Sequence, residues 1–425
     1  MNGRYHWDKQ LPEGVADLFY AEAARKRAAE ERLRQVFFSY GYTEIIPPTF
    51  EHYESLATEA GAQLQEEMYR FFSREGRTLA LRADMTIPIA RIVGTKLYDQ
   101  PLPLRFCYYA ANVFRHEEPQ AGRRHEFTQA GVELIGAAGE QADAEVMILL
   151  VEALQKLGLR DFRISLGQVA FFKALMRESP IPAETMALLR QALDVKDDIT
   201  LRRLVAELEL PLGVAALFAA LPQLQGGPEM LDSAERLSLE PAARAAVRSL
   251  RRVHELLVAA GVADYVQFDL AQVRGMDYYT GILFQVFVPG LGFPICSGGR
   301  YDDLIAHFGA DLPAVGFAMG VERLLLALEA QHVDLPVDIA PHLIISGQPW
   351  TESVRLASAA RRNGLRAELE LTGRSGDDLI RYAVAKEARY LLSSAGAERW
   401  RVWQRGVERI CTLDDLLQEM MHWSV

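Results

Sequence analysis

The stretch AVGFAMGVERLLLALEA, residues 314–330, predicts a strand, a turn and a helix in direct succession. Short runs with β character precede it along the chain. They include residues 68–73, 78–84, 104–115, 126–136, 161–168, 265–270, 277–288 and 295–299. Their alternating charges and aromatic residues favour antiparallel strands over a parallel sheet. The stretch therefore indicates the last strand and a flanking helix of an antiparallel sheet, in a fold of the α+β class.

A helical segment interrupts these β runs. Residues 170–262 are rich in Leu and Ala and predict a helical insert, with the β runs on both sides belonging to one sheet. After a linker at 331–341, residues 342–425 alternate strand and helix patterns, which predicts a small α/β domain with a parallel sheet. We therefore expect a core at 1–330 that contains the insert, then the linker and a C-terminal domain.

Length and composition exclude several classes of protein. The chain has 425 residues, 50% of them hydrophobic, and a formal net charge of −11, which lowers the expectation of RNA binding. Its apolar stretches are too short for a membrane span, and we expect no secretory signal at the N-terminus. Cys107, Cys296 and Cys411 are far apart in the sequence. This spacing suits a cytoplasmic protein without disulfides or metal sites.

Polar residues gather beside the predicted strands, whereas generic catalytic and phosphate-binding signatures are missing from the sequence. The clusters are LRADMT (81–86), FRHEE (114–118), TQAGVE (128–133), VRGMDYYTG (273–281), SGGRYDD (297–303) and GVERL (320–324). A turn or an ordinary helix start explains SGGRYDD or GVERL taken alone. VRGMDYYTG, however, makes a poor apolar core, and a buried glutamate such as Glu133 needs a partner. Together the clusters favour a small-molecule pocket.

The order of these motifs resembles that of class II aminoacyl-tRNA synthetases. FRHEE is similar to their second signature motif and AVGFAMGVERL to the third, while VRGMDYY and GGRYDDL resemble the two histidine-specific motifs of histidyl-tRNA synthetase. The resemblance covers nearly the whole chain. It implies a class II antiparallel sheet with flanking helices, followed by an α/β domain that resembles an anticodon-binding domain.

Two subfamilies share these motifs, the synthetase itself and the regulatory subunit of the short-form ATP phosphoribosyltransferase. Synthetases typically have LRPEGT where this chain has LRADMTIPIARI at 81–92, a version that resembles the regulatory subunit. EFTQAGVELIG and DYYTGILFQVF favour the same subfamily. Ala83 departs from the proline that is usual in both.

The charge of the loop at 114–127 supports this choice. It holds three Arg and three Glu, so its net charge is zero with His neutral. Glu118 and Glu126 stand where synthetases generally have basic or uncharged residues, in the loop that meets the acceptor end of tRNA. Like charges a few ångströms apart cost about 1 kcal/mol even in water. These acids therefore act against RNA phosphates.

The C-terminal domain gives a separate argument of the same kind. Asp377 and Asp378 replace the lysines of a loop that often has the sequence RSLKKQ in histidyl-tRNA synthetase. Residues 336–425 as a whole contain twelve basic and twelve acidic side chains, so the domain is neutral. The resemblance thus implies a retained fold without tRNA binding.

The resemblance, carried over position by position, implies a binding site for free histidine. The matching positions are Asp84, Thr86, Gln129, Glu133, Arg274, Tyr278, Tyr279 and Tyr301. Asp84 belongs to the group that holds the α-ammonium, and Arg274 lies near the carboxylate. By the same resemblance, Glu133 and Tyr279 match the residues on the two imidazole nitrogens. The chemistry fits this match, since a carboxylate and a phenol can together recognise the ring. Asp84 is one methylene shorter than the glutamate of the synthetase.

Three further positions, Arg115, Glu117 and Arg323, match the ATP-binding residues of the synthetase. A leftover ion-pair network explains them as well as nucleotide binding does, so we treat them as a vestigial nucleotide site. The resemblance implies no catalytic residue, cofactor or metal in this chain.

The expected function is that of a non-catalytic regulatory subunit in the first step of histidine biosynthesis. It would bind the short catalytic transferase, support the transfer of phosphoribosyl to ATP, and mediate allosteric feedback inhibition by histidine. We expect a homodimer, formed through the region near 44–50, within a larger hetero-oligomer and without tRNA or membrane partners. An active histidyl-tRNA synthetase and a free-standing histidine sensor are the alternatives.

Overall fold

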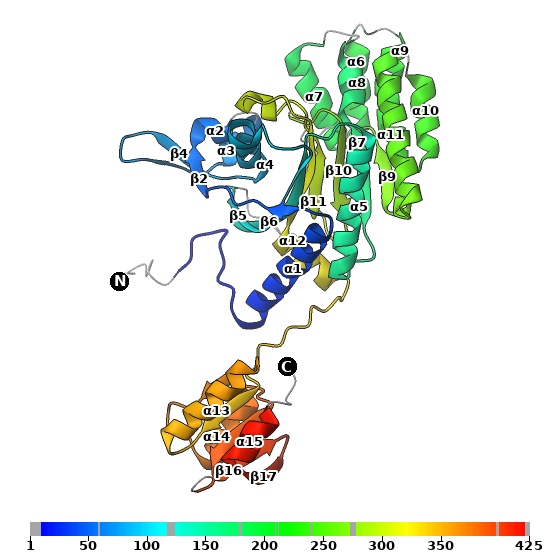
Figure 1. Ribbon diagram of the computed structural model, residues 1–425. Helices are drawn as coiled ribbons and strands as arrows, with labels where there is room; N and C mark the ends of the chain where they lie inside the picture. The colour runs from blue at the N-terminus through cyan, green and yellow to red at the C-terminus, as the bar shows by residue number, and fades with distance from the viewer. Residues whose placement is uncertain are drawn as a thin grey trace, which may run out of the picture. The chain divides into compact units, whose positions relative to one another are not determined.

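The computed structural model describes residues 10–57, 60–116, 124–177, 181–208, 210, 212–238, 240–272, 278–396 and 399–420. The chain forms two compact units, which span residues 1–335 and 336–425 (Figure 1). Each unit has its own hydrophobic core. Among the described residues, no helix combines the length and the apolar character needed to cross a membrane.

A nine-stranded sheet forms the centre of the first unit. Its strands, in spatial order, are β1 (Thr43–Glu44), β5 (Leu104–Phe114), β6 (Glu126–Ile135), β12 (Ala314–Gly320), β11 (Cys296–Arg300), β10 (Ile282–Phe287), β7 (Arg163–Gln168), β9 (Val266–Asp269) and β8 (Gln225–Gly226). The pairs β1–β5 and β7–β9 are parallel, and the other neighbours are antiparallel. The expected α+β fold with an antiparallel sheet is confirmed.

Four helices pack on one another and on the strands of this sheet. They are α1 (Tyr20–Ser39), α5 (Glu140–Leu157), α11 (Pro241–Ala259) and α12 (Val321–Ala330). Apolar residues at helical spacing, such as Leu33 and Phe37 in α1, are fully buried in the shared core. Helix α5 ends at Gly158, whose φ of 106° is the left-handed conformation that glycine adopts readily at a helix end.

A second group of elements lies beside β5 and β6 of the large sheet (Figure 1). It consists of the small sheet β2 (Phe50–His52), β4 (Thr78–Leu81) and β3 (Arg70–Phe72), the helices α2 (Tyr53–Ala57), α3 (Gly61–Glu67) and α4 (Thr86–Ile92), and the π-helix η2 (Val93–Leu97). The buried guanidinium of Arg82 donates to the carbonyls of Asn112 and Pro47, both at 2.7 Å. These bonds tie the segment before α4 to β5.

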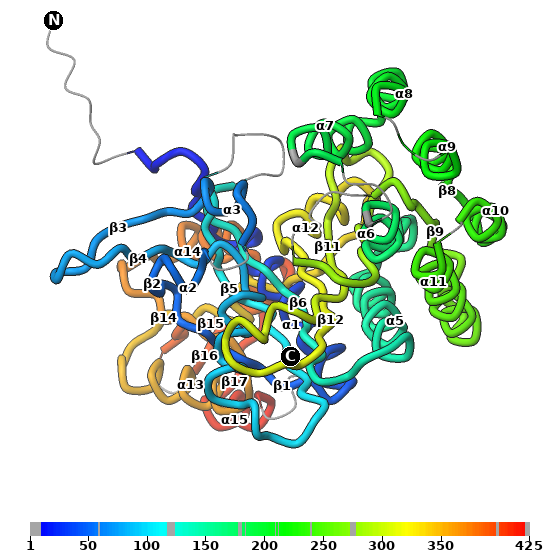
Figure 2. The backbone as a smooth tube through the Cα atoms, turned by 90° about the horizontal axis from the view of Figure 1, so that it is seen from above, coloured from blue at the N-terminus to red at the C-terminus, as the bar shows by residue number. Residues whose placement is uncertain are grey.

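The helical segment between β7 and β9 lies to one side of the sheet in both views (Figures 1 and 2). Before α11 it comprises α6 (Val169–Arg177), α7 (Ala183–Asp194), α8 (Asp198–Glu207), α9 (Leu212–Ala220) and α10 (Glu229–Leu237). Three 3-10 turns of the first unit are η3 (Leu221–Gln223), η4 (Ala263–Tyr265) and η5 (Ile305–Phe308). Strands β7 and β9 are neighbours, so the chain leaves the sheet and returns beside its point of departure.

The second unit holds a five-stranded sheet and three helices. The elements are β14 (Ala367–Leu369), β13 (Leu343–Ser346), β15 (Tyr390–Ser394), β16 (Arg399–Gln404), β17 (Val407–Thr412), α13 (Trp350–Arg362), α14 (Gly376–Ala385) and α15 (Leu413–Met420). The expected parallel sheet is wrong for β16 and β17, which pair antiparallel. Arg405 and Gly406 both have positive φ, 47° and 86°, and close a two-residue hairpin that makes β16 and β17 antiparallel.

Candidate functional site

Glu133 of β6 lies at the centre of a cluster of hydroxyl groups on the face of the sheet opposite Val132 and Leu134. The Thr86 hydroxyl, at the start of α4, donates to Glu133 Oε1 at 2.9 Å. The Tyr301 hydroxyl, just after β11, donates to Oε2. The structure thus brings together three of the residues predicted from the sequence, which come from three separate parts of the chain.

Tyr108 of β5 is a fourth member of this cluster, and the sequence patterns do not single it out. Its hydroxyl lies 3.5 Å from Glu133 Oε1. Tyr108 pairs with Gly131 across the β5–β6 ladder, and the register shifts directly after it. A Cβ atom at Gly131 would meet the Tyr108 phenol at 2.7 Å. A glycine inside a strand often marks such a close approach. Gly131 is therefore the one feature of the sequence that could have indicated a bulky neighbour such as Tyr108 at this point of the strand.

Gly316 of β12 makes room for the Glu133 carboxyl. The two residues are direct partners across the β6–β12 ladder. A Cβ atom at Gly316 would collide with Glu133 Oε2. Any larger residue at 316 would therefore displace the carboxyl group from its hydroxyl partners.

Burial changes the acidity of this carboxyl. It raises the pKa of Glu133 from 4.5 to about 8, because a charge is poorly solvated in a site that is 1% exposed. The three hydroxyl donors favour the ionised form and lower the pKa, while the negative charge of Asp84 raises it. Burial has the largest effect. The carboxyl therefore exchanges its proton near neutral pH.

This shift predicts how stability depends on pH. The folded protein holds the Glu133 proton up to about pH 8, whereas the unfolded chain releases it near 4.5. Because the folded state binds more protons between these values, its free energy of unfolding falls as pH rises from about 4.5 to 8, by at most about 1.4 kcal/mol per pH unit from this group. Urea unfolding of wild type and Glu133→Gln across this range should show the free energy of unfolding of wild type falling relative to that of the variant as pH rises. Parallel curves would contradict the shift.

A second group of predicted residues lies beside Glu133. The Tyr278 hydroxyl donates to the Tyr279 hydroxyl at 3.1 Å. Asp84 accepts from the backbone N–H of Ile87 at 3.3 Å, and burial raises its pKa, partly offset by the positive charge of Arg115. Gln129 is 6% exposed, and its Oε1 atom has no hydrogen-bond partner among the described residues. A buried acceptor of this kind favours a polar ligand.

These residues line one cavity of about 140 Å³. Its lining includes Asp84, Thr86, Arg115, Gln129, Glu133, Tyr278, Tyr279, Tyr301 and Arg323. All the predicted site residues that the structure describes are therefore in one place. Arg274 and Glu117 lie outside the described residues. The volume suits a small metabolite better than a drug-sized molecule.

Two arginines form a cationic part of the cavity wall. The Nε atom of Arg115 donates to the Ala83 carbonyl at 2.8 Å, and its guanidinium lies 5.4 Å from the Phe127 ring centre. Arg323 donates to the Pro294 carbonyl at 3.0 Å and lies 5.3 Å from the ring centre of Phe293. A backbone carbonyl and an aromatic face thus fix each cation. This part of the cavity favours an anionic group.

Arg300, in the SGGRYDD segment, has a structural role. Its Nε and Nη2 atoms lie 2.8 and 2.7 Å from Asp143 Oδ1 in a buried ion pair, and it is absent from the cavity lining. The pair fixes the end of β11 next to Tyr301. Among the described residues, no group of three or more His, Cys, Asp or Glu side chains could hold a metal ion.

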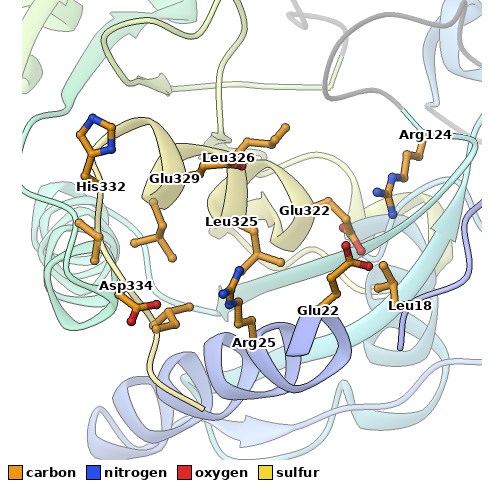
Figure 3. Close-up of a pocket in the computed structure, with 13 residues that line it drawn as sticks. Leu18, Glu22, Arg25, Arg124, Glu322, Leu325, Leu326, Glu329, His332 and Asp334 are labelled. Carbon is orange, nitrogen blue, oxygen red and sulfur yellow. The ribbon is translucent and has the colours of Figure 1, made fainter. Parts of the chain in front are cut away.

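A larger cleft of about 710 Å³ lies elsewhere in the first unit, between α1 and α12 (Figure 3). Its lining includes Leu325 and Leu326. At one end the side chains of Glu22, Glu322 and Arg124 point toward one another (Figure 3). None of the predicted site residues lines this cleft. The candidate site is therefore the smaller, polar cavity.

Comparison with known proteins places the chain in a family. A family model described as histidyl-tRNA synthetase matches residues 14–324. The chain is 44% identical over 379 residues to the ATP phosphoribosyltransferase regulatory subunit of Moorella thermoacetica, covering 89% of this chain and 96% of the relative. It is 40% identical over 358 residues to the regulatory subunit of Thermoanaerobacter pseudethanolicus, covering 84% and 92% of the two chains.

Solved structures agree with the sequence relatives. A Bacillus halodurans structure described as an ATP phosphoribosyltransferase regulatory subunit/histidyl-tRNA synthetase has a TM-score of 0.81 at 31% identity, covering 92% of this chain and 99% of that chain. Histidyl-tRNA synthetase from Nostoc has a TM-score of 0.78 at 20% identity, covering 97% and 99%, which shows a shared fold. The chain therefore belongs to the ATP phosphoribosyltransferase regulatory subunits, a family built on the class II histidyl-tRNA synthetase fold.

Proposed function

We propose that this chain binds free histidine in the Glu133 cavity, activates a short-form ATP phosphoribosyltransferase and transmits feedback inhibition by histidine to it. The observation that carries the proposal is the gathering of nine predicted residues around one cavity, in a chain whose relatives are named regulatory subunits. Chemical steps would take place on the partner. The regulatory family supports a non-catalytic role for this chain.

The polar groups of the cavity match those of histidine. Glu133 and the Tyr279 hydroxyl offer an acceptor and a donor for the two imidazole nitrogens. Asp84 and the unpaired Oε1 atom of Gln129 offer acceptors for the α-ammonium group. An ammonium beside Asp84 would favour its ionised form, which burial now disfavours. The ligand would thus satisfy groups that are costly to bury alone.

The cationic wall of Arg115 and Arg323 supports binding of an anionic group. It would hold the histidine carboxylate together with Arg274, or a nucleotide phosphate. We propose a vestigial nucleotide site here, because the cations are retained next to Phe127 and Phe293.

A homodimer would form through the region near residues 44–50. Strand β1 is at the edge of the large sheet, where unpaired backbone groups are available to a second chain. Ile46 is 78% exposed and Phe50 53% exposed. Burying such residues in a dimer would remove apolar surface from water. The homodimer would present every other surface of the chain twice, and it would therefore support a larger hetero-oligomer with the transferase.

Binding and charging of tRNA test this proposal against the synthetase alternative. Asp377 and Asp378 lie in the first turn of α14, where the helix dipole favours acids, and Glu126 accepts from Asn112 at 2.8 Å. Acids held at these positions would repel phosphates, so filter binding over a salt series should give weak affinity and a shallow slope. Glu118 lies outside the described residues. Robust aminoacylation by the purified chain would contradict the proposal.

A further inference from the structure

A lysine of the helical segment contacts the backbone of one of the two pocket tyrosines. Lys173, in the middle of α6, donates from Nζ to the carbonyl oxygen of Tyr279 at 2.9 Å in a partly buried contact. Lys173 is not among the residues that line the cavity. Its ammonium therefore contacts Tyr279 outside the cavity, at the main-chain carbonyl and not at the phenol.

Two further backbone bonds hold the same short segment, Tyr278–Gly281. The N–H of Val169, at the start of α6, donates to the Gly281 carbonyl at 2.8 Å. The Thr280 N–H donates to the Arg300 carbonyl at 2.7 Å. Helix α6 thus supplies two of these contacts, while the Thr280 hydroxyl donates to the Arg300 carbonyl at 3.3 Å and accepts from the Asp302 N–H at 3.0 Å. Strand β10 begins only at Ile282. The segment before it is therefore held by these hydrogen bonds and not by pairing within β10.

Fixing this backbone fixes both phenols. The ring centres of Tyr278 and Tyr279 are 4.4 Å apart, and their hydroxyls share a hydrogen bond of 3.1 Å. Tyr278 also packs edge-on against Tyr301 at 6.0 Å between ring centres, and Tyr301 donates to Glu133. A shift of the Tyr279 carbonyl would therefore move the hydroxyls of both tyrosines and disturb the packing of Tyr278 on Tyr301.

Helix α6 is itself part of the helical segment. Phe171 and Phe172 are buried in the core, and Phe172 packs edge-on against Phe218 of α9 at 6.1 Å between ring centres. Helix α6 also packs on α11. A displacement of these helices would therefore reach Lys173, and a ligand in the cavity would in turn restrain α6.

We infer that Lys173 is a positioning residue for the Tyr278–Tyr279 pair and couples the occupancy of the cavity to the helices α6–α11. The inference rests on the proposed histidine site. Because coupling between sites is reciprocal, a partner that displaces α6 would change histidine affinity by the same factor by which histidine changes that partner's affinity. The helical segment then carries the histidine signal out of the cavity.

The test is isothermal titration of histidine into wild type and three variants. Lys173→Met keeps most of the stem but removes the charged donor, and we expect the dissociation constant to rise about tenfold, as for loss of a charge-assisted hydrogen bond. Lys173→Arg keeps a charged donor and should stay within threefold of wild type. Lys156→Met, an exposed lysine of α5, is the control and should match wild type. If Lys173→Met fails to fold, Lys173→Gln takes its place.

Hydrogen exchange separates positioning from a general loss of stability. Histidine should slow amide exchange in α6 at least fivefold in wild type and Lys173→Arg, with little slowing in Lys173→Met. Equal slowing in all variants, or an unchanged dissociation constant for Lys173→Met, would overturn the inference and leave the histidine site intact. No histidine binding by wild type would overturn both.

Discussion

Glu133→Gln is expected to remove most of the stabilisation that histidine gives to this protein. At a hundredfold excess over its dissociation constant, a ligand adds about 2.7 kcal/mol to the free energy of unfolding. Hydrogen bonds to charged groups contribute roughly 1.5–3 kcal/mol, and Glu133 is a buried carboxyl that accepts from the Thr86, Tyr108 and Tyr301 hydroxyls. Its amide replacement keeps the shape but places an NH₂ donor where one carboxyl oxygen accepts hydrogen bonds.

Thermal shift and isothermal titration check this expectation. At the histidine concentration that saturates wild type, a hundredfold weaker variant would retain only about 0.4 kcal/mol of stabilisation. Glu329→Gln is the matched control, because Glu329 is an exposed carboxylate in the larger cleft between α1 and α12. The control should keep the full shift. A full shift in Glu133→Gln would place histidine outside the Glu133 cavity.

The second large effect is expected on a partner enzyme. A short-form transferase should form phosphoribosyl-ATP efficiently only when this chain is present, and histidine should inhibit the mixture through the Glu133 cavity. Coupling between two sites is typically 1–3 kcal/mol, or about 5–150-fold in affinity. Reciprocity then requires the transferase substrates to weaken histidine binding here, if the two ligands favour competing states. Arg274→Ala and Glu133→Gln should both assemble with the transferase but resist histidine.

The fold class could be predicted because each strand and helix leaves a residue pattern within one short stretch of the sequence. The predicted β runs at 126–136 and 277–288 contain β6 and β10, although β10 begins only at Ile282, and the Leu- and Ala-rich segment 170–262 contains the helices α6–α11 and the short strand β8. The C-terminal hairpin escaped prediction because Arg405–Gly406 has weak turn chemistry. A non-glycine residue with positive φ at Arg405 is uncommon.

The site could be predicted only in part, because its members meet through register and packing. Glu133 and Gln129 share a strand face, which the period of two gives directly. The position of the Tyr108 hydroxyl depends on a register shift in β5. The contact made by Lys173 depends on how α6 packs against the segment before β10. Neither the shift nor the packing leaves a signal in one stretch of sequence. The pKa of Glu133 likewise depends on burial that only the assembled fold shows.

The most direct test of the central claim is phosphoribosyl-ATP formation by a co-purified complex of this chain and a short-form transferase, measured as histidine is raised. For the wild-type complex we predict activity that histidine suppresses. For the Glu133→Gln complex we predict comparable activity at zero histidine and a half-inhibitory concentration at least tenfold higher. Equal histidine sensitivity of the two complexes, or failure of this chain to co-elute with any short-form transferase, would contradict the account.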